Sequence, residues 1–151
     1  MGYFLEIWLR GFAKDYLRKI SIRDEESYHP HITFVRPFDL ETEYEESIRK
    51  RIVDFCNGKD PIPFSLEGRD SFDGKIIYFP VINFDKLLEF NDSLEQVLDG
   101  NVKFTQKLSD KKLLHATIDF KDEGFSCPKI EQYMLRLTGI KDKRIWFSFD
   151  F

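Results

Sequence analysis

Hydrophobic positions along the chain alternate between runs that suit buried strands and stretches with a helical period. The run YFLEIWL, residues 3–9, is short, apolar and rich in aromatic residues, which is typical of a buried β-strand, and Gly11 marks its end. Over residues 12–20 the apolar side chains recur every three or four positions, which indicates an amphipathic helix. The first 20 residues therefore predict a strand followed by a helix.

The same kind of pattern continues to the middle of the chain. HITFV, residues 31–35, predicts a second strand that Pro37 closes. Residues 41–58 carry apolar side chains on one helical face and predict a helix that stops at Gly58. Residues 63–68, PFSLEG, predict a third strand.

From residue 75 the order of elements begins again. The second half is expected to contain a strand, a helix, a strand, a helix and a strand, over residues 75–82, 85–100, 113–120, 127–137 and 144–151. Pro128 suits the first turn of the second of these helices. A short additional strand is expected around VKF, within an otherwise irregular loop near residues 99–112, and another loop near residues 21–28. The repeated order indicates an internal duplication.

The two halves, roughly residues 1–70 and 74–151, are expected to pack together as one domain. No linker rich in proline, glycine or serine separates them, and a chain of 151 residues that is 42% hydrophobic can bury a sizeable core. Mixed strands and helices of this kind predict the α+β class.

Charge and cysteine content narrow the classes of partner. The net charge is −4, and lysine and arginine are nowhere concentrated in the way that a protein tracking a long phosphate backbone requires. Any phosphate-bearing partner should therefore be small or held at one end. Cys56 and Cys127 lie far apart and outside any C-x-x-C spacing, which favours a reducing compartment over a zinc site or a disulfide framework.

Nothing in the sequence indicates a membrane or an export signal. The first ten residues lack a basic leader, Glu6 stands where a myristoylation signal has serine or threonine, and no apolar run approaches the roughly 18 residues of a membrane span. We expect a soluble, cytoplasmic protein.

Two of the three histidines stand two residues before a threonine, at matching points of the two halves. These are His31 with Thr33 and His115 with Thr117. Because side chains alternate across a strand, each histidine shares a face with its threonine, about 6.6 to 6.8 Å away along the chain. Composition by itself would produce this spacing at two of three histidines with a probability of roughly 0.3%. The matched pair therefore indicates function, although threonine is common in strands.

Paired imidazoles and hydroxyls suit acid–base chemistry on an anion. A neutral imidazole can take a proton from an attacking water while an imidazolium gives one to the leaving oxygen, and both forms exist near neutral pH. Threonine hydroxyls can donate hydrogen bonds to non-bridging oxygens. A phosphodiester fits this description better than a carboxylic ester, because no serine or cysteine nucleophile stands in a recognisable motif.

The segments HITF (31–34) and HATI (115–118) resemble the paired His-x-Thr/Ser-x motifs of the 2H phosphoesterases, which include the 2'-5' RNA ligase and cyclic phosphodiesterase branch. The resemblance covers nearly the whole chain in length, duplication and motif placement. It implies two pseudo-symmetric lobes of antiparallel sheet with outer helices, enclosing a central cleft. It also implies opening of a 2',3'-cyclic or related cyclic phosphate without a metal or another cofactor, with both histidines catalytic and both threonines on the phosphate.

The expected substrate is a small cyclic nucleotide or an RNA terminus, and we expect a monomer. We expect His115 to activate water and His31 to protonate the leaving ribose oxygen. Two alternatives stay open. One is a protein of the same fold that binds a nucleotide or RNA end without turnover. The other is a zinc hydrolase using His29, His31 and His115, which would leave both threonines unexplained.

Four further residues near the motif strands could contact a substrate. Arg36 could meet an anion, but strict alternation puts it on the side of Ile32 and Phe34, unless a bulge turns it. Three aromatic residues could stack on a base, although packing in the core or at the rim is the more ordinary role of such rings; they are Tyr28, Phe38 and Phe125.

Overall fold

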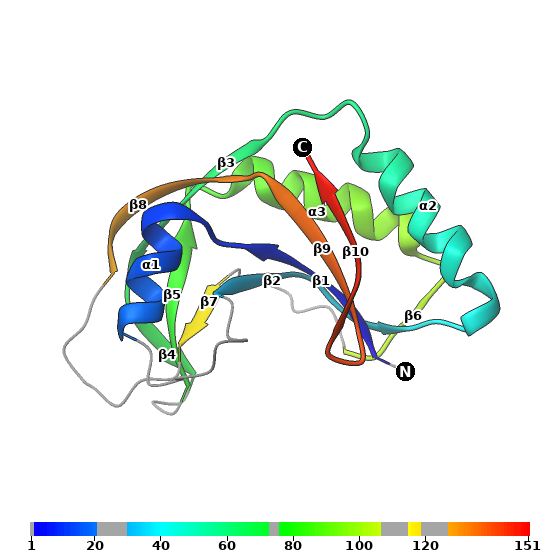
Figure 1. Ribbon diagram of the computed structural model, residues 1–151, viewed down its shortest axis with the longest axis horizontal. Coiled ribbons are helices and arrows are strands. Elements are labelled where there is room, and N and C mark those ends of the chain that lie inside the picture. Colours follow the sequence, from blue (N-terminus) through cyan, green and yellow to red (C-terminus); the bar gives the residue numbers. More distant parts are fainter. Residues whose placement is uncertain (1, 21–29, 73–75, 107–114, 119–126) are drawn as a thin grey trace.

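A computed structural model describes residues 2–20, 30–72, 76–106, 115–118 and 127–151 (Figure 1). The first half contains β1 (Tyr3–Trp8), α1 (Gly11–Ile20), β2 (His31–Asp39), the 3-10 turn η1 (Thr42–Tyr44), α2 (Glu45–Cys56), β3 (Ile62–Gly68) and β4 (Asp70–Phe72). The second half contains β5 (Ile76–Ile82), α3 (Asp85–Leu98), β6 (Lys103–Phe104), β7 (His115–Ile118), β8 (Cys127–Met134), β9 (Arg136–Lys141) and β10 (Arg144–Asp150).

The strands form two antiparallel sheets that meet at β5. The order along them is β10-β9-β1-β2-β7-β5-β3-β8, with β4 paired to β5 and β6 paired to β2. Ile77 to Pro80 of β5 pair with β7, whereas Val81 and Ile82 pair with β3, so β5 passes from one sheet to the other. The fold is therefore α+β, as the pattern of the sequence predicts, and antiparallel, as the family resemblance implies.

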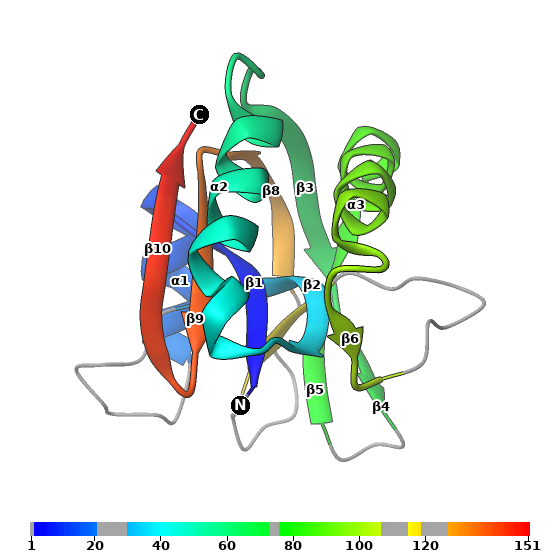
Figure 2. The ribbon, with the colours of Figure 1, turned by 90° about the vertical axis from the view of Figure 1, so that its right-hand side faces the viewer.

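The three helices are spread along the sheets. Figure 1 shows α1 on the left, α2 on the right and α3 across the middle, and Figure 2 looks from the side of α2. The helices α2 and α3 pack on each other and against β10, β2 and β3, whereas α1 contacts β8. None of the described helices is both long and apolar enough to cross a membrane.

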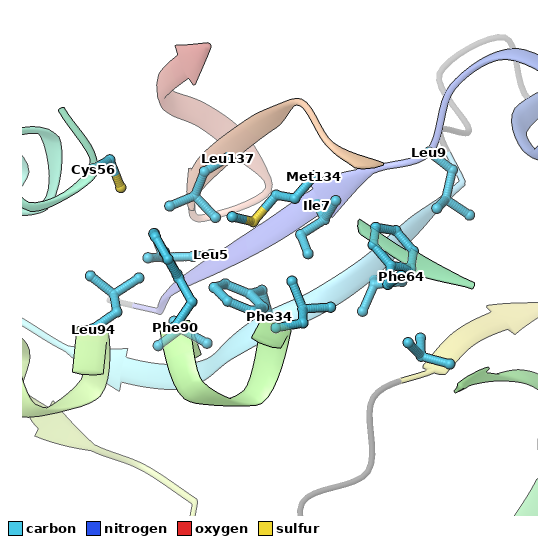
Figure 3. Packing of buried hydrophobic residues seen from close by; sticks show 14 of the residues in the cluster. Leu5, Ile7, Leu9, Phe34, Cys56, Phe64, Phe90, Leu94, Met134 and Leu137 are labelled. Atoms are coloured by element: carbon cyan, nitrogen blue, oxygen red, sulfur yellow. The ribbon is translucent and has the colours of Figure 1, made fainter. Parts of the chain in front are cut away.

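The part of the core shown in Figure 3 includes side chains that pack between the strands β1 and β2 and the helix α3. Alternate residues of β1, Leu5 and Ile7, point toward Phe34 of β2 and toward Phe90 and Leu94 of α3 (Figure 3). Burying an aliphatic or aromatic side chain of this size contributes about 1.5 to 3 kcal/mol to folding. This packing buries one face of β1 and β2, and His31 and Thr33 lie on the opposite face of β2.

β2 carries two one-residue bulges that follow its His-x-Thr segment. Thr33 pairs with Glu6 and Val35 pairs with Leu5, so Phe34 is an extra residue in β2. A second extra residue lies between Val35 and Phe38. Because of the first bulge, Phe34 and Val35 are both buried, and the segment before it keeps regular alternation.

The predicted helix over residues 127–137 is wrong, because these residues form β8 and the start of β9. The buried residues Cys127, Ile130 and Met134 are spaced as on a helix, which explains the prediction. The backbone groups of β8 instead pair with β3 from Ile62 to Gly68, through a bulge that alters strict alternation. The order strand, helix, strand, helix, strand is therefore not repeated in the second half.

The other predicted elements are present, with boundaries shifted by a few residues, but Pro37 does not close the second strand, because β2 runs through it to Asp39. β4 and β9 were not predicted as separate strands, and β6 is the short strand expected around VKF. The predicted loop at residues 21–28 and residues 107–112 of the predicted loop at 99–112 lie outside the described residues.

Candidate active site

The two motif-bearing strands, 84 residues apart in the sequence, are neighbours in the sheet. β2 and β7 lie next to each other (Figure 1). They are antiparallel, and Ile32 pairs with Ala116, the middle residue of each His-x-Thr segment. In an antiparallel ladder this register sets His31 opposite Thr117 and Thr33 opposite His115. For residues 115–118 the structure describes the backbone, so their part of the site is defined by register.

On β2 the predicted residues lie on the solvent side. Ile32 is fully buried, whereas the His31 side chain is 36% exposed and Thr33 is exposed. The bulge at Phe34 begins directly after Thr33, where it does not disturb the shared face of this pair. The imidazole and hydroxyl of the first motif can therefore meet a ligand from solvent.

A carboxylate that sequence reasoning did not single out lies beside His31. Glu6 of β1 is the register partner of Thr33, and its side chain is only 8% exposed. Its Oε2 lies 3.4 Å from His31 Nε2, an ion-pair distance, and its Oε1 accepts a hydrogen bond of 2.6 Å from Trp8 Nε1. The available signal was one acidic residue within the apolar run YFLEIWL, since an almost buried glutamate is rare unless it is paired.

The strand β9, which pairs with β1 on the side away from β2, places a buried hydroxyl opposite Glu6. Thr138 of β9 is the register partner of Glu6 and is fully buried, and within the described part of the chain its Oγ1 has no hydrogen-bond partner. Trp8 and His31 are thus the described partners of the Glu6 carboxylate.

The second motif has a different neighbour. Tyr78 of β5 is the register partner of Thr117, as Glu6 of β1 is the register partner of Thr33. Burial raises the pKa of the Tyr78 phenol, and the nearby Asp70 carboxylate raises it further. A neutral phenol therefore occupies the place beside the second motif that a carboxylate occupies beside the first.

Arg36 is held on the helix-covered side, where strict alternation would also put it, although two bulges interrupt β2. Its Nε lies 3.3 Å from Glu95 Oε1 of α3, its Nη1 donates to the Gln106 carbonyl, and its guanidinium carbon lies 4.0 Å from the centre of the Phe104 ring. These contacts fix the guanidinium against the protein.

Of the three aromatic candidates for substrate contact, the structure describes one, Phe38. Phe38 is fully buried, with its ring stacked on Tyr3 at 5.7 Å and edge-on to Phe104 at 6.1 Å, which is the packing alternative. Tyr28 and Phe125 lie outside the described residues.

Of the three histidines considered for a zinc site, the structure describes the side chain of one, His31. His29 and the side chain of His115 lie outside the described part of the chain. Within that part, no three histidine, cysteine, aspartate or glutamate side chains gather as a metal site would require. The zinc alternative stays a hypothesis that an experiment with a chelator addresses.

Fold and strand pairing define the class: an α+β protein of antiparallel sheets in which two His-x-Thr strands lie next to each other. The family model described as the 2'-5' RNA ligase superfamily matches residues 18–145, a span that contains both motifs. The chain therefore belongs to this superfamily, which is that of the 2H phosphoesterases. No curated protein matches the chain.

Proposed function

We propose that this protein is a metal-independent phosphodiesterase that opens a 2',3'-cyclic or related cyclic phosphate on a nucleotide or an RNA end. The observation that carries the proposal is the pairing of Ile32 with Ala116, which joins the two motif strands at corresponding residues. Membership of the 2'-5' RNA ligase superfamily supports a phosphoesterase-type activity.

The register supports a reaction centre between four side chains. In a regular antiparallel ladder, opposed residues lie on the same side of the sheet about 4.5 to 5.5 Å apart, and diagonal neighbours about 7 to 8 Å apart. His31 and His115 take one diagonal of such a square, and Thr33 and Thr117 take the other. A phosphate above its centre would have an imidazole on each of two opposite sides, as an in-line displacement requires.

The proposed reaction is one displacement at phosphorus. His115 takes a proton from water as the water oxygen bonds to phosphorus, the bond from phosphorus to one ribose oxygen breaks, and His31 protonates that oxygen. Thr33 and Thr117 donate hydrogen bonds to the non-bridging oxygens. The product is a phosphate monoester, and exchange of protons with solvent restores both histidines.

The proposal is tested by product formation with EDTA present. The panel contains 2',3'-cyclic nucleotides, a short RNA with a 2',3'-cyclic end and ADP-ribose 1'',2''-cyclic phosphate, and it is run with wild type, His31→Ala and His115→Ala. We expect opening of at least one substrate and loss of almost all turnover in both variants. Near-normal turnover by His31→Ala would contradict the mechanism.

The same panel separates the two alternatives. Activity that EDTA removes and Zn²⁺ restores would support the zinc hydrolase. Tight binding of a cyclic nucleotide without product over many hours would support a binding protein on the same fold.

A further inference from the structure

Glu6 is a buried carboxylate beside the first motif, and we propose that it is a positioning residue that fixes the tautomer and orientation of His31. This inference rests on the proposed function, in which His31 exchanges a proton with the substrate. It adds a member to the site that neither His-x-Thr motif contains. The residue acts through His31 and is not required to touch the substrate.

The strand register brings Glu6 and its partners to one face. Glu6 pairs with Thr33 across β1 and β2, and Trp8, two residues on, pairs with His31. The four residues therefore form two adjacent cross-strand pairs. Because its side chain is only 8% exposed, the Glu6 carboxylate depends on protein donors in place of water.

Each oxygen of the Glu6 carboxylate faces one nitrogen. Oε1 accepts the hydrogen of Trp8 Nε1 at 2.6 Å, and an indole nitrogen can only donate. Oε2 faces His31 Nε2 at 3.4 Å. Since a carboxylate can only accept, this approach is favourable when Nε2 carries a hydrogen. Glu6 thereby favours the His31 tautomer that carries its hydrogen on Nε2.

Within the described strands, the second motif has no carboxylate at the position that corresponds to Glu6. Tyr78, the register partner of Thr117, offers a phenol in the place that corresponds to Glu6. This phenol forms a hydrogen bond with the Asp70 carboxylate and is neutral, so it does not offer a neighbouring ring the charged acceptor that Glu6 offers. The neighbouring strand therefore distinguishes two motifs that are otherwise alike in sequence.

The substitution Glu6→Gln tests the inference because it preserves shape and changes hydrogen bonding. Trp8 Nε1 still needs an acceptor, so it will take the amide oxygen and leave the amide NH₂ facing His31 Nε2. A donor at that place requires Nε2 to accept, and the ring hydrogen moves to Nδ1. We expect kcat to fall about 10²- to 10⁴-fold with KM changed little, as when a catalytic histidine is held in the wrong tautomer.

The tautomer itself can be read without any assay of activity. The chain has three histidines, so ¹⁵N spectra of the imidazole rings at alkaline pH, assigned with His31→Ala, will show which nitrogen of His31 carries the hydrogen. We expect Nε2–H in the wild type and Nδ1–H in Glu6→Gln. A wild-type ring with its hydrogen on Nδ1 would overturn the inference, whether or not Glu6→Gln folds.

A double variant gives a result that a merely structural role would not. In Trp8→Phe with Glu6→Gln the indole donor is gone, so the amide is free to turn its oxygen toward His31 and restore Nε2–H. We expect the double variant to be more active than Glu6→Gln, by about tenfold or more. If the two losses simply add, Glu6 does not act through the tautomer.

A matched control is Glu131→Gln, an exposed glutamate on β8, for which we expect unchanged activity. The two proposals fail in different ways. Wild-type turnover in His31→Ala would reject the proposed mechanism, and the spectra would still decide the tautomer. Loss of turnover in His31→Ala, with Glu6→Gln fully active, would reject the inference and leave the proposed function intact.

Discussion

A nearly buried carboxylate inside a strand requires donors around it, because its charge is otherwise strongly unfavourable away from water. Glu6 obtains its donors from Trp8 on its own strand and from His31 on the next one. The same contacts therefore explain how the glutamate is tolerated and how the histidine ring is held. At the scale of single residues, the contacts that stabilise the Glu6 carboxylate are the same contacts that hold the His31 ring.

Thr33 should contribute one charge-assisted hydrogen bond to the proposed reaction. It is exposed on the open face of β2, so Thr33→Ala should leave the fold unchanged. A hydrogen bond to a charged group is worth roughly 1.5 to 3 kcal/mol, so kcat/KM should fall about 10- to 150-fold. Steady-state kinetics on the best substrate of the panel measure this, and Thr117→Ala should behave alike.

Thr33→Ser is the matched control, because it keeps the hydroxyl and removes only a methyl group. We expect activity within a few-fold of wild type. A loss in Thr33→Ser equal to that in Thr33→Ala would assign the effect to packing of the methyl group.

The two buried cysteines predict a loss of stability at alkaline pH. Burial raises the pKa of Cys56 to about 12, and burial with the charge of Glu67 raises that of Cys127 to about 11. Unfolded thiols ionise near pH 8.5 while the folded ones stay protonated, so the unfolded state binds fewer protons and the free energy of unfolding falls as pH rises. The urea midpoint should be lower at pH 10 than at pH 8.

The substitution Cys56→Ala should reduce this dependence on pH between 8.5 and 10, although it lowers stability at every pH by removing a buried side chain. Above pH 10 the raised pKa values of Tyr3, Tyr16 and Tyr78 add a fall of the same sign. An unchanged slope in Cys56→Ala would mean that this thiol does not remain protonated in the folded protein.

At the scale of elements, bulges in β2 decide which residues meet the core and which meet solvent. The extra residue Phe34 lets two consecutive side chains enter the core directly after Thr33. The side-chain amide of the buried Asn91 of α3 donates to the Phe34 carbonyl at this bulge. The helix α3 thus holds the part of β2 that directly follows the His-x-Thr segment.

Because β9 packs closely on β10, adding a single methyl group at Gly139 is expected to lower stability. A methyl group at Gly139 would lie 2.6 Å from Cδ1 of Phe147 and 3.1 Å from Cε3 of Trp146. Because Phe147 is buried, its ring cannot turn away freely, and Gly139→Ala should lower the free energy of unfolding by about 1 to 3 kcal/mol. Urea denaturation measures this.

Gly2→Ala is the control for that prediction, since a methyl group there would meet nothing within 4 Å. Its urea midpoint should match wild type, with a change below about 0.5 kcal/mol. Equal stability of both variants would show that Phe147 can move at little cost.

At the scale of the whole molecule, charge sets the size of partner that we expect. With a net charge of −4 the chain offers little general attraction to a long polyanion. For RNAs with the same 2',3'-cyclic end and lengths from about 3 to 20 nucleotides, KM should change less than about threefold. A KM that falls steeply with length and rises steeply with salt would indicate an extended RNA-binding surface.

Most single elements could be predicted from the sequence because local periodicity is strong. The helices α1, α2 and α3 and the strands β1, β2, β3, β5, β7 and β10 follow the spacing of apolar residues. The failure at β8 has a physical cause, since burial at Cys127, Ile130 and Met134 has the same spacing as a helix face. Only pairing with β3, whose residues lie 59 to 72 positions earlier than their partners, distinguishes the two structures.

The sequence by itself determined the chemistry that is available: two His-x-Thr segments, the elements that carry them and the family to which the chain belongs. Those follow from side-chain identity and local spacing. Tertiary structure decided which strands pair, and so it set Ile32 beside Ala116 and Glu6 beside His31. Long-range pairing depends on backbone hydrogen bonds and on burial summed over the whole sheet, which no local pattern encodes.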